Sequence, residues 1–221
     1  MRLLAIGDIH GCLTALDTLL QIVKLQPTDQ LVTLGDYVDR GPESAGVIDR
    51  ILELHQRFRV VSLRGNHEVM MLEARDSSAE AKFWAGCHGY ETLQSYPQPS
   101  LDAVPDEHWH FLDETCRPWF ETERHIFVHA NLDPELALDD QPPEQIYWEK
   151  FSADWAIPHV SGKIMVCGHT EQRNGEPLSI DFAHCIDTWA FAGQWLTCLN
   201  VIDGRYWQAN NRGKTRTGWL K

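Results

Sequence analysis

The sequence predicts an α/β fold built on a parallel sheet with crossover helices, and three observations lead to it. Over the first 75 residues, short apolar runs alternate with segments of helical spacing, the pattern of a βαβαβ unit. Further apolar runs follow a looser middle region. The alternation of apolar and polar residues from Trp195 to Ile202 then predicts an antiparallel second sheet. With 221 residues, the chain is long enough for one large domain with a substantial core.

The βαβαβ unit consists of three predicted strands and the helices between them. The strands are expected at 3–6, 31–34 and 60–63, where apolar residues dominate. The first helix is predicted by apolar residues at helical spacing, Leu13, Leu16, Leu19, Leu20 and Val23. The second is expected to carry Pro42 in its first turn, followed by an apolar stripe of Val47, Ile48, Ile51 and Leu52. A third helix is expected from Glu68 onward.

The rest of the chain is less regular. From about Asp76 to Glu123, prolines and isolated aromatic residues predict short helices and loops. Strands are expected again at 126–128 and 164–167, and an acidic, proline-containing loop at 133–144. The tail from Asn211 to Lys221 carries four basic residues and is expected to be a solvated end. We expect one domain over residues 1–221.

Composition excludes several classes of function. The formal net charge of −13 argues against a nucleic-acid or membrane-surface binder, although a cationic metal site could still bind phosphorylated substrates. The N-terminal apolar run is too short for a signal peptide, and no stretch approaches a membrane span. The six cysteines are far apart, which predicts reduced thiols in a cytoplasmic protein. We expect a monomer.

Polar clusters follow the carboxyl ends of the predicted strands. The first three read GDIHG (7–11), GDYVDRG (35–41) and RGNHE (64–68). Two later strands are followed by His129 and by Gly168-His169-Thr170. Ligands of open α/β sheets gather outside the carboxyl ends of strands, so these clusters are expected to converge although they are distant in sequence.

The residue types in these clusters predict a metal centre. Six side chains offer oxygen or nitrogen without thiolate: Asp8, His10, Asp36, Asn66, His129 and His169. Such a set suits manganese, iron or zinc and disfavours a structural zinc finger. Six ligands are more than one catalytic zinc needs. With one bridging carboxylate they fit two ions about 3.5 to 4 Å apart, and Asp36, on the middle strand, is the expected bridge.

The ordered motifs GDIHG, GDYVDRG and GNHE resemble the calcineurin-like metallophosphoesterases. The VDRG and GNHE endings are closest to the phosphoprotein phosphatase branch, including its small bacterial and phage members. FWAGCHGYETLQSY (83–96), GHT (168–170) and IDTWAFAGQWLT (186–197) extend the resemblance over most of the chain. The resemblance implies a four-layer α/β/β/α sandwich, with two mixed sheets flanked by helices and two divalent ions. It assigns the first ion to Asp8, His10, Asp36 and His169, and the second to Asp36, Asn66 and His129.

Phosphoester hydrolysis assigns further roles. Two cations would lower the pKa of a bridging water, which then attacks as hydroxide. Arg40 and Arg64 flank the cluster and are expected to bind phosphate oxygens, with Asn66 also near the substrate. His67 is the predicted general acid, because imidazole titrates near ~6.5. As in related phosphatases, Asp39 is expected to orient it.

The sequence departs from the family pattern at several positions. Lys150, a further expected phosphate contact, stands where relatives often carry arginine, and it keeps the charge but loses the planar fork. Asn131 and Trp189 occupy positions that are usually glycine, and Cys87-His88 replaces Asn-Gly. These changes leave the ligands intact and point to an altered pocket rim. Residues 76–125 are expected to shape the active-site face.

Three functions are compatible with the motifs. The leading one is a manganese-dependent phosphatase acting on phosphoserine or phosphothreonine, with phosphotyrosine also open. The second is hydrolysis of diadenosine polyphosphates or another small phosphoester, which GDIHGCLTALDTLL fits equally well. Asp39-Arg40 and the glutamate of GNHE favour the first. The third is a non-catalytic scaffold, which would be expected to have lost ligands or the acid.

Overall fold

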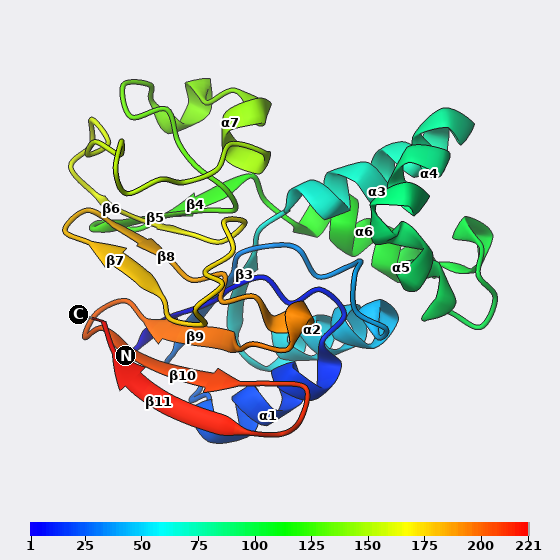
Figure 1. Cartoon of the computed structure of the whole chain (residues 1–221), viewed down its shortest axis with the longest axis horizontal. Helices are drawn as coiled ribbons and strands as arrows, with labels where there is room; N and C mark the ends of the chain where they lie inside the picture. The colour runs from blue at the N-terminus through cyan, green and yellow to red at the C-terminus, as the bar shows by residue number, and fades with distance from the viewer. Residues whose placement is uncertain (221) are drawn as a thin grey trace.

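Strand β1 lies inside a six-stranded sheet that carries the first half of the predicted site. The computed structural model describes residues 1–220 (Figure 1). In the order β11-β10-β9-β1-β2-β3, the strands are Thr215–Trp219, Arg205–Ala209, Leu196–Asn200, Leu3–Ile6, Gln30–Thr33 and Arg59–Ser62. β1, β2 and β3 are parallel, so their carboxyl ends lie at one edge. This confirms the predicted βαβαβ unit.

A second sheet of five strands packs against the first. In the order β4-β5-β6-β8-β7, the strands are Trp119–Glu121, His125–Val128, Ile164–Cys167, Ala183–Cys185 and Leu178–Ile180. β5, β6 and β8 are parallel, while β4 and β7 pair antiparallel at the two edges. Both sheets are therefore mixed, as the family resemblance implied. Strand β4 was not predicted, because it lies within the region of irregular sequence pattern.

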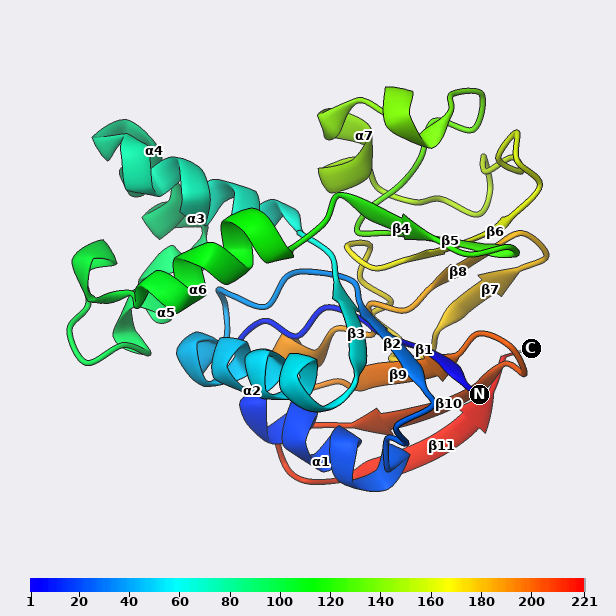
Figure 2. The same ribbon diagram turned by 180° about the vertical axis from the view of Figure 1, so that it is seen from behind.

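The two-residue period of each strand separates the layers. In β1, Leu4 and Ile6 belong to the cluster packed under the helices, while Leu3 and Ala5 face the other sheet with Phe127 of β5. A third apolar cluster covers the outer face of the second sheet, against helix α7 (Pro143–Tyr147). The layers are thus helix, sheet, sheet and helix, which confirms the predicted four-layer sandwich (Figure 2).

Helices α1 (Leu13–Val23) and α2 (Ser44–Arg57) cover the first sheet through apolar stripes. Pro42 was expected in the first turn of the second helix, but α2 begins two residues later. Asp39 and Arg40 both adopt positive φ (69° and 67°), so the chain is still turning when it reaches Pro42. α3 (Asn66–Asp76) starts directly after β3, with Glu68 in its first turn.

Residues 77–118 form the short helices and loops that the sequence predicted. The elements are α4 (Ser78–Trp84), η1 (Ala85–Gly89), α5 (Tyr90–Gln94), η2 (Leu101–Ala103), α6 (Asp106–His110) and η3 (Phe111–Thr115). Together with α3 they extend from one end of the two sheets in both views (Figures 1 and 2). Two further short turns, η4 (Leu138–Asp140) and η5 (Ala190–Ala192), lie in the later loops.

One expectation about the C-terminal region was wrong, and one was incomplete. β9 was expected in an antiparallel second sheet, but it pairs antiparallel with β1 in the first sheet, because alternation reveals a strand without revealing its partner. The tail was expected to be a solvated end, and none of residues 211–220 is buried; what the sequence pattern did not reveal is that they include the edge strand β11, which pairs with β10. Lys221 lies outside the described residues. No helix within residues 1–220 has the length and apolar character needed to cross a membrane.

Candidate active site

The polar clusters meet where the carboxyl ends of the two sheets face each other. The loop after β1 is joined to the loop after β2, because the amides of Ile9 and His10 both donate to the Asp36 carbonyl, at 3.0 and 2.8 Å. The loop after β6 joins the loop after β5 through the Gly168 amide and the His129 carbonyl, at 2.8 Å. The predicted convergence of distant motifs is therefore present.

Asp36 lies between two histidines. Its Oδ2 is 3.2 Å from Nε2 of His10, and its Oδ1 is 3.5 Å from Nε2 of His129. Burial alone would raise the pKa of Asp36, but His129, His67 and His10 hold that pKa well below its usual range. A carboxylate that turns one oxygen to each side is the geometry a bridging ligand needs.

Two groups of side chains lie on either side of Asp36, one of which includes the predicted acid His67, and Asp8 belongs to neither. Ligand atoms of His10, Asp36 and His67 all lie within 4.8 Å of one another, and so do those of Asp36, His129 and His169. Asn66 joins the second group, since its Oδ1 is 3.1 Å from Nε2 of His129. Asp36 is common to both groups, which supports its predicted role as the bridge.

Hydrogen bonds on the far side of each imidazole fix which nitrogen faces the site. Nδ1 of His10 lies 2.8 Å from the Val38 carbonyl, and Nδ1 of His129 lies 2.8 Å from the Leu34 carbonyl. Donation from Nδ1 leaves the lone pair of Nε2 directed at the site. Burial lowers the pKa of His129 to about 4, so its ring is neutral, as ligation requires.

His169 occupies a different side from the one the resemblance implied. It was expected to share an ion with Asp8 and His10, but its ring centroid is 5.1 Å from that of His129. Only its backbone meets Asp8, donating from the amide to Oδ2 at 2.9 Å. Its Nε2 lies 3.1 Å from the Trp148 carbonyl, which leaves Nδ1 as the ligand atom. His169 therefore belongs with the second group.

Asp8 has an unsatisfied oxygen that a cation would satisfy. Its Oδ1 is buried without a hydrogen-bond partner, which is costly for a carboxylate. Burial, Asp187 and Asp36 together raise its pKa well above the usual range. A Cβ on Gly168 would lie 2.0 Å from this oxygen, and a Cβ on Gly65 would lie 2.1 Å from Oδ1 of Asp36. Glycine is thus required beside each carboxylate.

Backbone strain is concentrated at this site. Of the eight non-glycine residues with positive φ within residues 1–220, five carry predicted roles: His10, Asp36, Asp39, Arg40 and His169. Each such conformation costs about 1–3 kcal/mol and is kept only where the surrounding structure imposes it. These strained turns direct the side chains away from the sheets and into one volume.

His67 forms the expected pair with Asp39. Nδ1 of His67 is 2.6 Å from Oδ2 of Asp39, and both side chains are buried. Asp39 is also held by Thr92, whose Oγ1 donates to Oδ1 at 2.7 Å, and by Trp84, whose Nε1 donates to Oδ2 at 2.9 Å. No periodicity or spacing singled out Thr92 or Trp84 within their short helices, although both lie in the 83–96 segment that resembles the family.

The three side chains predicted to contact phosphate differ in which groups of the protein they already contact. Arg40 has its guanidinium carbon 4.5 Å from the ring centre of Phe191, and its Nη2 is 3.2 Å from Nε2 of His67. Arg64 instead donates to backbone carbonyls of η3, from Nε to Leu112 at 3.0 Å and from Nη2 to Asp113. The side chain of Lys150 is 61% exposed and pairs with Glu171 at 3.1 Å.

The sequence predicted only that Glu68 lies at the start of a helix, but its side chain also joins two loops of the site. Its buried carboxylate accepts four backbone N–H groups, at 2.8 to 3.2 Å, from Asp36, Tyr37, Val38 and Gly65. Burial and the nearby Asp36 raise its pKa to about 7. One side chain therefore joins the loop that carries the bridging carboxylate to the loop that carries Asn66 and His67.

Comparison with known proteins shows which family has this sequence and this arrangement of side chains. The family model for calcineurin-like phosphoesterases matches residues 1–203, and that span includes every candidate ligand described above. The chain belongs to the calcineurin-like phosphoesterase family. It is therefore a phosphoesterase, and the family implies divalent metal ions, which the carboxylate, amide and imidazole donors of this site fit.

The chain is also similar in sequence to proteins named as protein phosphatases and to proteins named as dinucleotide tetraphosphatases. The chain is 30% identical over 209 residues to serine/threonine-protein phosphatase 1 of Salmonella typhimurium, covering 89% of this chain and 90% of that protein. It is 34% identical over 142 residues to the symmetrical bis(5'-nucleosyl)-tetraphosphatase of Paracidovorax citrulli, covering 63% of this chain. It spans only 47% of that second protein.

Superposition on solved structures confirms the fold. A crystal structure of a candidate diadenosine tetraphosphatase superposes with a TM-score of 0.70 at 20% identity, over 100% of this chain and 95% of that one. A cold-active protein-tyrosine phosphatase from a Shewanella species superposes with a TM-score of 0.67 at 19% identity, over 98% and 80%. At this level of identity the likeness is one of fold.

Proposed function

We propose that this phosphoesterase is a serine/threonine protein phosphatase that uses two divalent cations, manganese first among them. The hydrogen-bonded pair of Asp39 and His67, beside the bridging carboxylate, is the observation on which this choice rests. The match to serine/threonine-protein phosphatase 1 over nine-tenths of both chains supports the choice.

The Asp39–His67 pair indicates which class of substrate is cleaved, because substrates differ in how much their leaving group needs a proton. Hydrolysis of a phosphoserine or phosphothreonine expels an alkoxide, which is strongly basic and needs a proton in the transition state. Cleavage within a polyphosphate chain expels a group that ends in a phosphate. The second pKa of a phosphate is about 6, so this group can depart without receiving a proton. A buried, oriented acid is therefore of most use to an enzyme that cleaves alcohol esters.

The donor groups suggest how the ions would be held. Asp8, His10 and Asp36 would bind one ion, and Asp36, Asn66, His129 and His169 would bind the other. When bound, such ions neutralise charge on the phosphoryl oxygens and make water more acidic. The unpartnered Oδ1 of Asp8 and the two-sided contacts of Asp36 support this assignment.

The side chains beside the ligands would bind phosphate and move a proton. Arg40 donates to Nε2 of His67 at 3.2 Å, so this nitrogen is occupied in the substrate-free protein. A phosphate would attract the Arg40 guanidinium to its own oxygens and free Nε2 of His67. Once free, Nε2 can bind a proton, and the imidazolium, with its Nδ1–H held by Asp39, can then deliver that proton to the departing oxygen. Arg64 and Lys150 could assist only after leaving their present partners.

A second candidate function is hydrolysis of dinucleotide polyphosphates. It is favoured by the tetraphosphatase relatives, one of which is 40% identical over 142 residues. To decide, kcat/KM is compared for a phosphoserine peptide and for diadenosine tetraphosphate on one manganese-loaded preparation. We expect the phosphopeptide to be preferred. Rapid cleavage of the dinucleotide with no phosphate release from peptides would overturn the proposal.

A further inference from the structure

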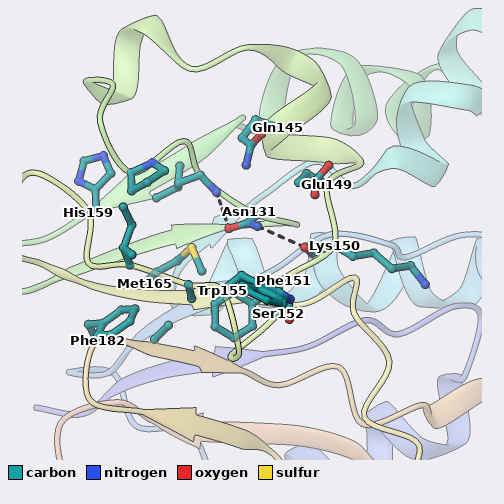
Figure 3. Close-up of a pocket in the computed structure, with 15 residues that line it drawn as sticks. Asn131, Gln145, Glu149, Lys150, Phe151, Ser152, Trp155, His159, Met165 and Phe182 are labelled. Atoms are coloured by element: carbon teal, nitrogen blue, oxygen red, sulfur yellow. Dashed lines mark hydrogen bonds between the residues drawn. The ribbon is translucent and has the colours of Figure 1, made fainter.

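A pocket opens on the outer face of the second sheet, beside the candidate active site (Figure 3). Its volume is about 300 Å³, at the small end of ligand-binding pockets. Met165 of β6 and Ala183 of β8 line it from the sheet, and Phe151 and Trp155 line it from the loop that crosses above. Asn131, Gln145 and Glu149 add polar groups to the lining. The pocket thus combines an apolar interior with several hydrogen-bonding groups.

The surface around this pocket is unusually apolar. Trp155 is 85% exposed, Ile157 58% and Val160 70%. Of the ten large apolar side chains that are exposed in the described part of the chain, five fall between residues 136 and 160. Trp155 and Ile157 also line the pocket, and exposed apolar side chains gathered at a pocket favour the binding of another molecule.

The loop that lines the pocket also contacts the segments that carry the candidate metal ligands. The carbonyl of Trp148 lies 3.1 Å from Nε2 of His169. The Asn131 side chain donates to the Lys150 carbonyl at 3.3 Å, and the Phe151 amide donates to Oγ1 of Thr170 at 2.9 Å. Residues 148–151 therefore form one edge of the ligand site and one wall of the pocket. In Figure 3 the Lys150 side chain points away from the other lining residues.

We propose that this pocket binds one apolar side chain of the phosphorylated polypeptide, at a fixed position next to the phosphorylated residue. The inference rests on the proposed function, because it requires a polypeptide substrate. A chain whose phosphate lies at Asp36 and Arg40 passes residues 148–151 when it runs toward the second sheet. Its backbone there meets the polar lining groups, and a leucine-sized or aromatic side chain fills the apolar interior.

The test is a panel of phosphoserine peptides in which leucine or alanine occupies each of the three positions on either side of the phosphoserine. In the wild-type protein, leucine at one position is expected to raise kcat/KM about tenfold over alanine. Trp155→Ala removes a wall and Ser152→Phe fills the pocket from its rim. Both variants are expected to abolish the leucine advantage while turnover of p-nitrophenyl phosphate stays unchanged. Neither residue is buried, so both variants should fold.

The matched control is Trp219→Ala, which removes a 59% exposed tryptophan from edge strand β11 and should keep the leucine advantage. Peptides that are hydrolysed well but without any positional preference would overturn this inference alone. So would a leucine advantage that survives both pocket variants, or a Trp155→Ala effect confined to diadenosine tetraphosphate. Failure to hydrolyse any phosphopeptide would overturn the proposed function itself.

Discussion

The indole of Trp84 donates to the carboxylate of Asp39 at 2.9 Å, although the two residues are 45 positions apart. Asp39 is fully buried and Trp84 nearly so, and the same carboxylate holds the His67 imidazole. The helices that extend beyond the sheets therefore reach the carboxylate partner of the predicted proton donor, through this bond and through the one from Thr92. These contacts give residues 78–94 a specific role in orienting the acid.

Removing the indole N–H should separate this orienting role from simple packing. In Trp84→Phe the aromatic ring remains but Asp39 loses one donor, and we expect a stability loss of about 1–3 kcal/mol. A tilted His67 should lower kcat for a phosphoserine peptide by about 10- to 100-fold. An activated aryl phosphate, whose phenolate departs unaided, should be affected much less. The measurement is kcat for both substrates, with Trp109→Phe in α6 as the control. Equal losses for both substrates would assign Trp84 a structural role only.

Replacing the acid itself should give a stronger form of the same pattern. His67→Asn removes the proton donor and should lower kcat for phosphoserine peptides by about 10²- to 10⁴-fold. Asp39→Asn should shift the same substrate ratio in the same direction, because the imidazole loses its carboxylate partner. The measurement is kcat as a function of leaving-group basicity. An unchanged dependence on the leaving group in His67→Asn would remove His67 from the role of acid.

The glycine beside Asp8 offers a test of the metal site without changing a ligand. In Gly168→Ala the new Cβ would lie 2.0 Å from Oδ1 of Asp8, so that the carboxylate must move. We expect manganese affinity to fall by about 10- to 100-fold, as when groups that orient ligands are altered. Metal content after dialysis against graded manganese concentrations measures the effect. Gly86→Ala is the control, since its Cβ would meet no atom within 4 Å. Equal metal binding in both variants would contradict the placement of Asp8.

The ligands were predictable from the sequence because of the topology of parallel strands. Carboxyl ends of parallel strands meet at one edge, so polar residues after each strand must converge. Contacts made by intervening segments were not predictable in this way. Trp84 and Thr92 reach Asp39 from short helices whose packing no periodicity reveals, and Arg64 is held by η3 carbonyls. The side of Asp36 on which His169 lies depends on its ring orientation, which sequence order does not encode.

A buried histidine away from the site should make stability depend on pH. Burial, followed by the neighbouring His125, lowers the pKa of His184 to about 4, and its Nδ1 lies 3.0 Å from Oγ of Ser179. The unfolded chain binds this proton near pH ~6.5. Between these values the unfolded state holds more protons than the folded state, so stability rises with pH and is lost on acidification. The full shift corresponds to about 3 kcal/mol, of which about 2 kcal/mol is lost by pH 5.

Urea unfolding at pH 7.5 and pH 5 measures this loss, in EDTA so that pH-dependent release of metal does not contribute. Glu68 and Asp187, whose pKa values burial raises to about 7 and about 6, act in the opposite direction. They are present in every variant, so the comparison with His184→Gln isolates the histidine. Glutamine keeps a hydrogen-bonding group near Ser179 but cannot titrate. We expect the variant to lose less stability than the wild type on acidification. Residue 184 then binds no proton in either the folded or the unfolded state, so this position no longer makes stability depend on pH. Identical pH profiles in the two proteins would show that His184 does not set the acid sensitivity.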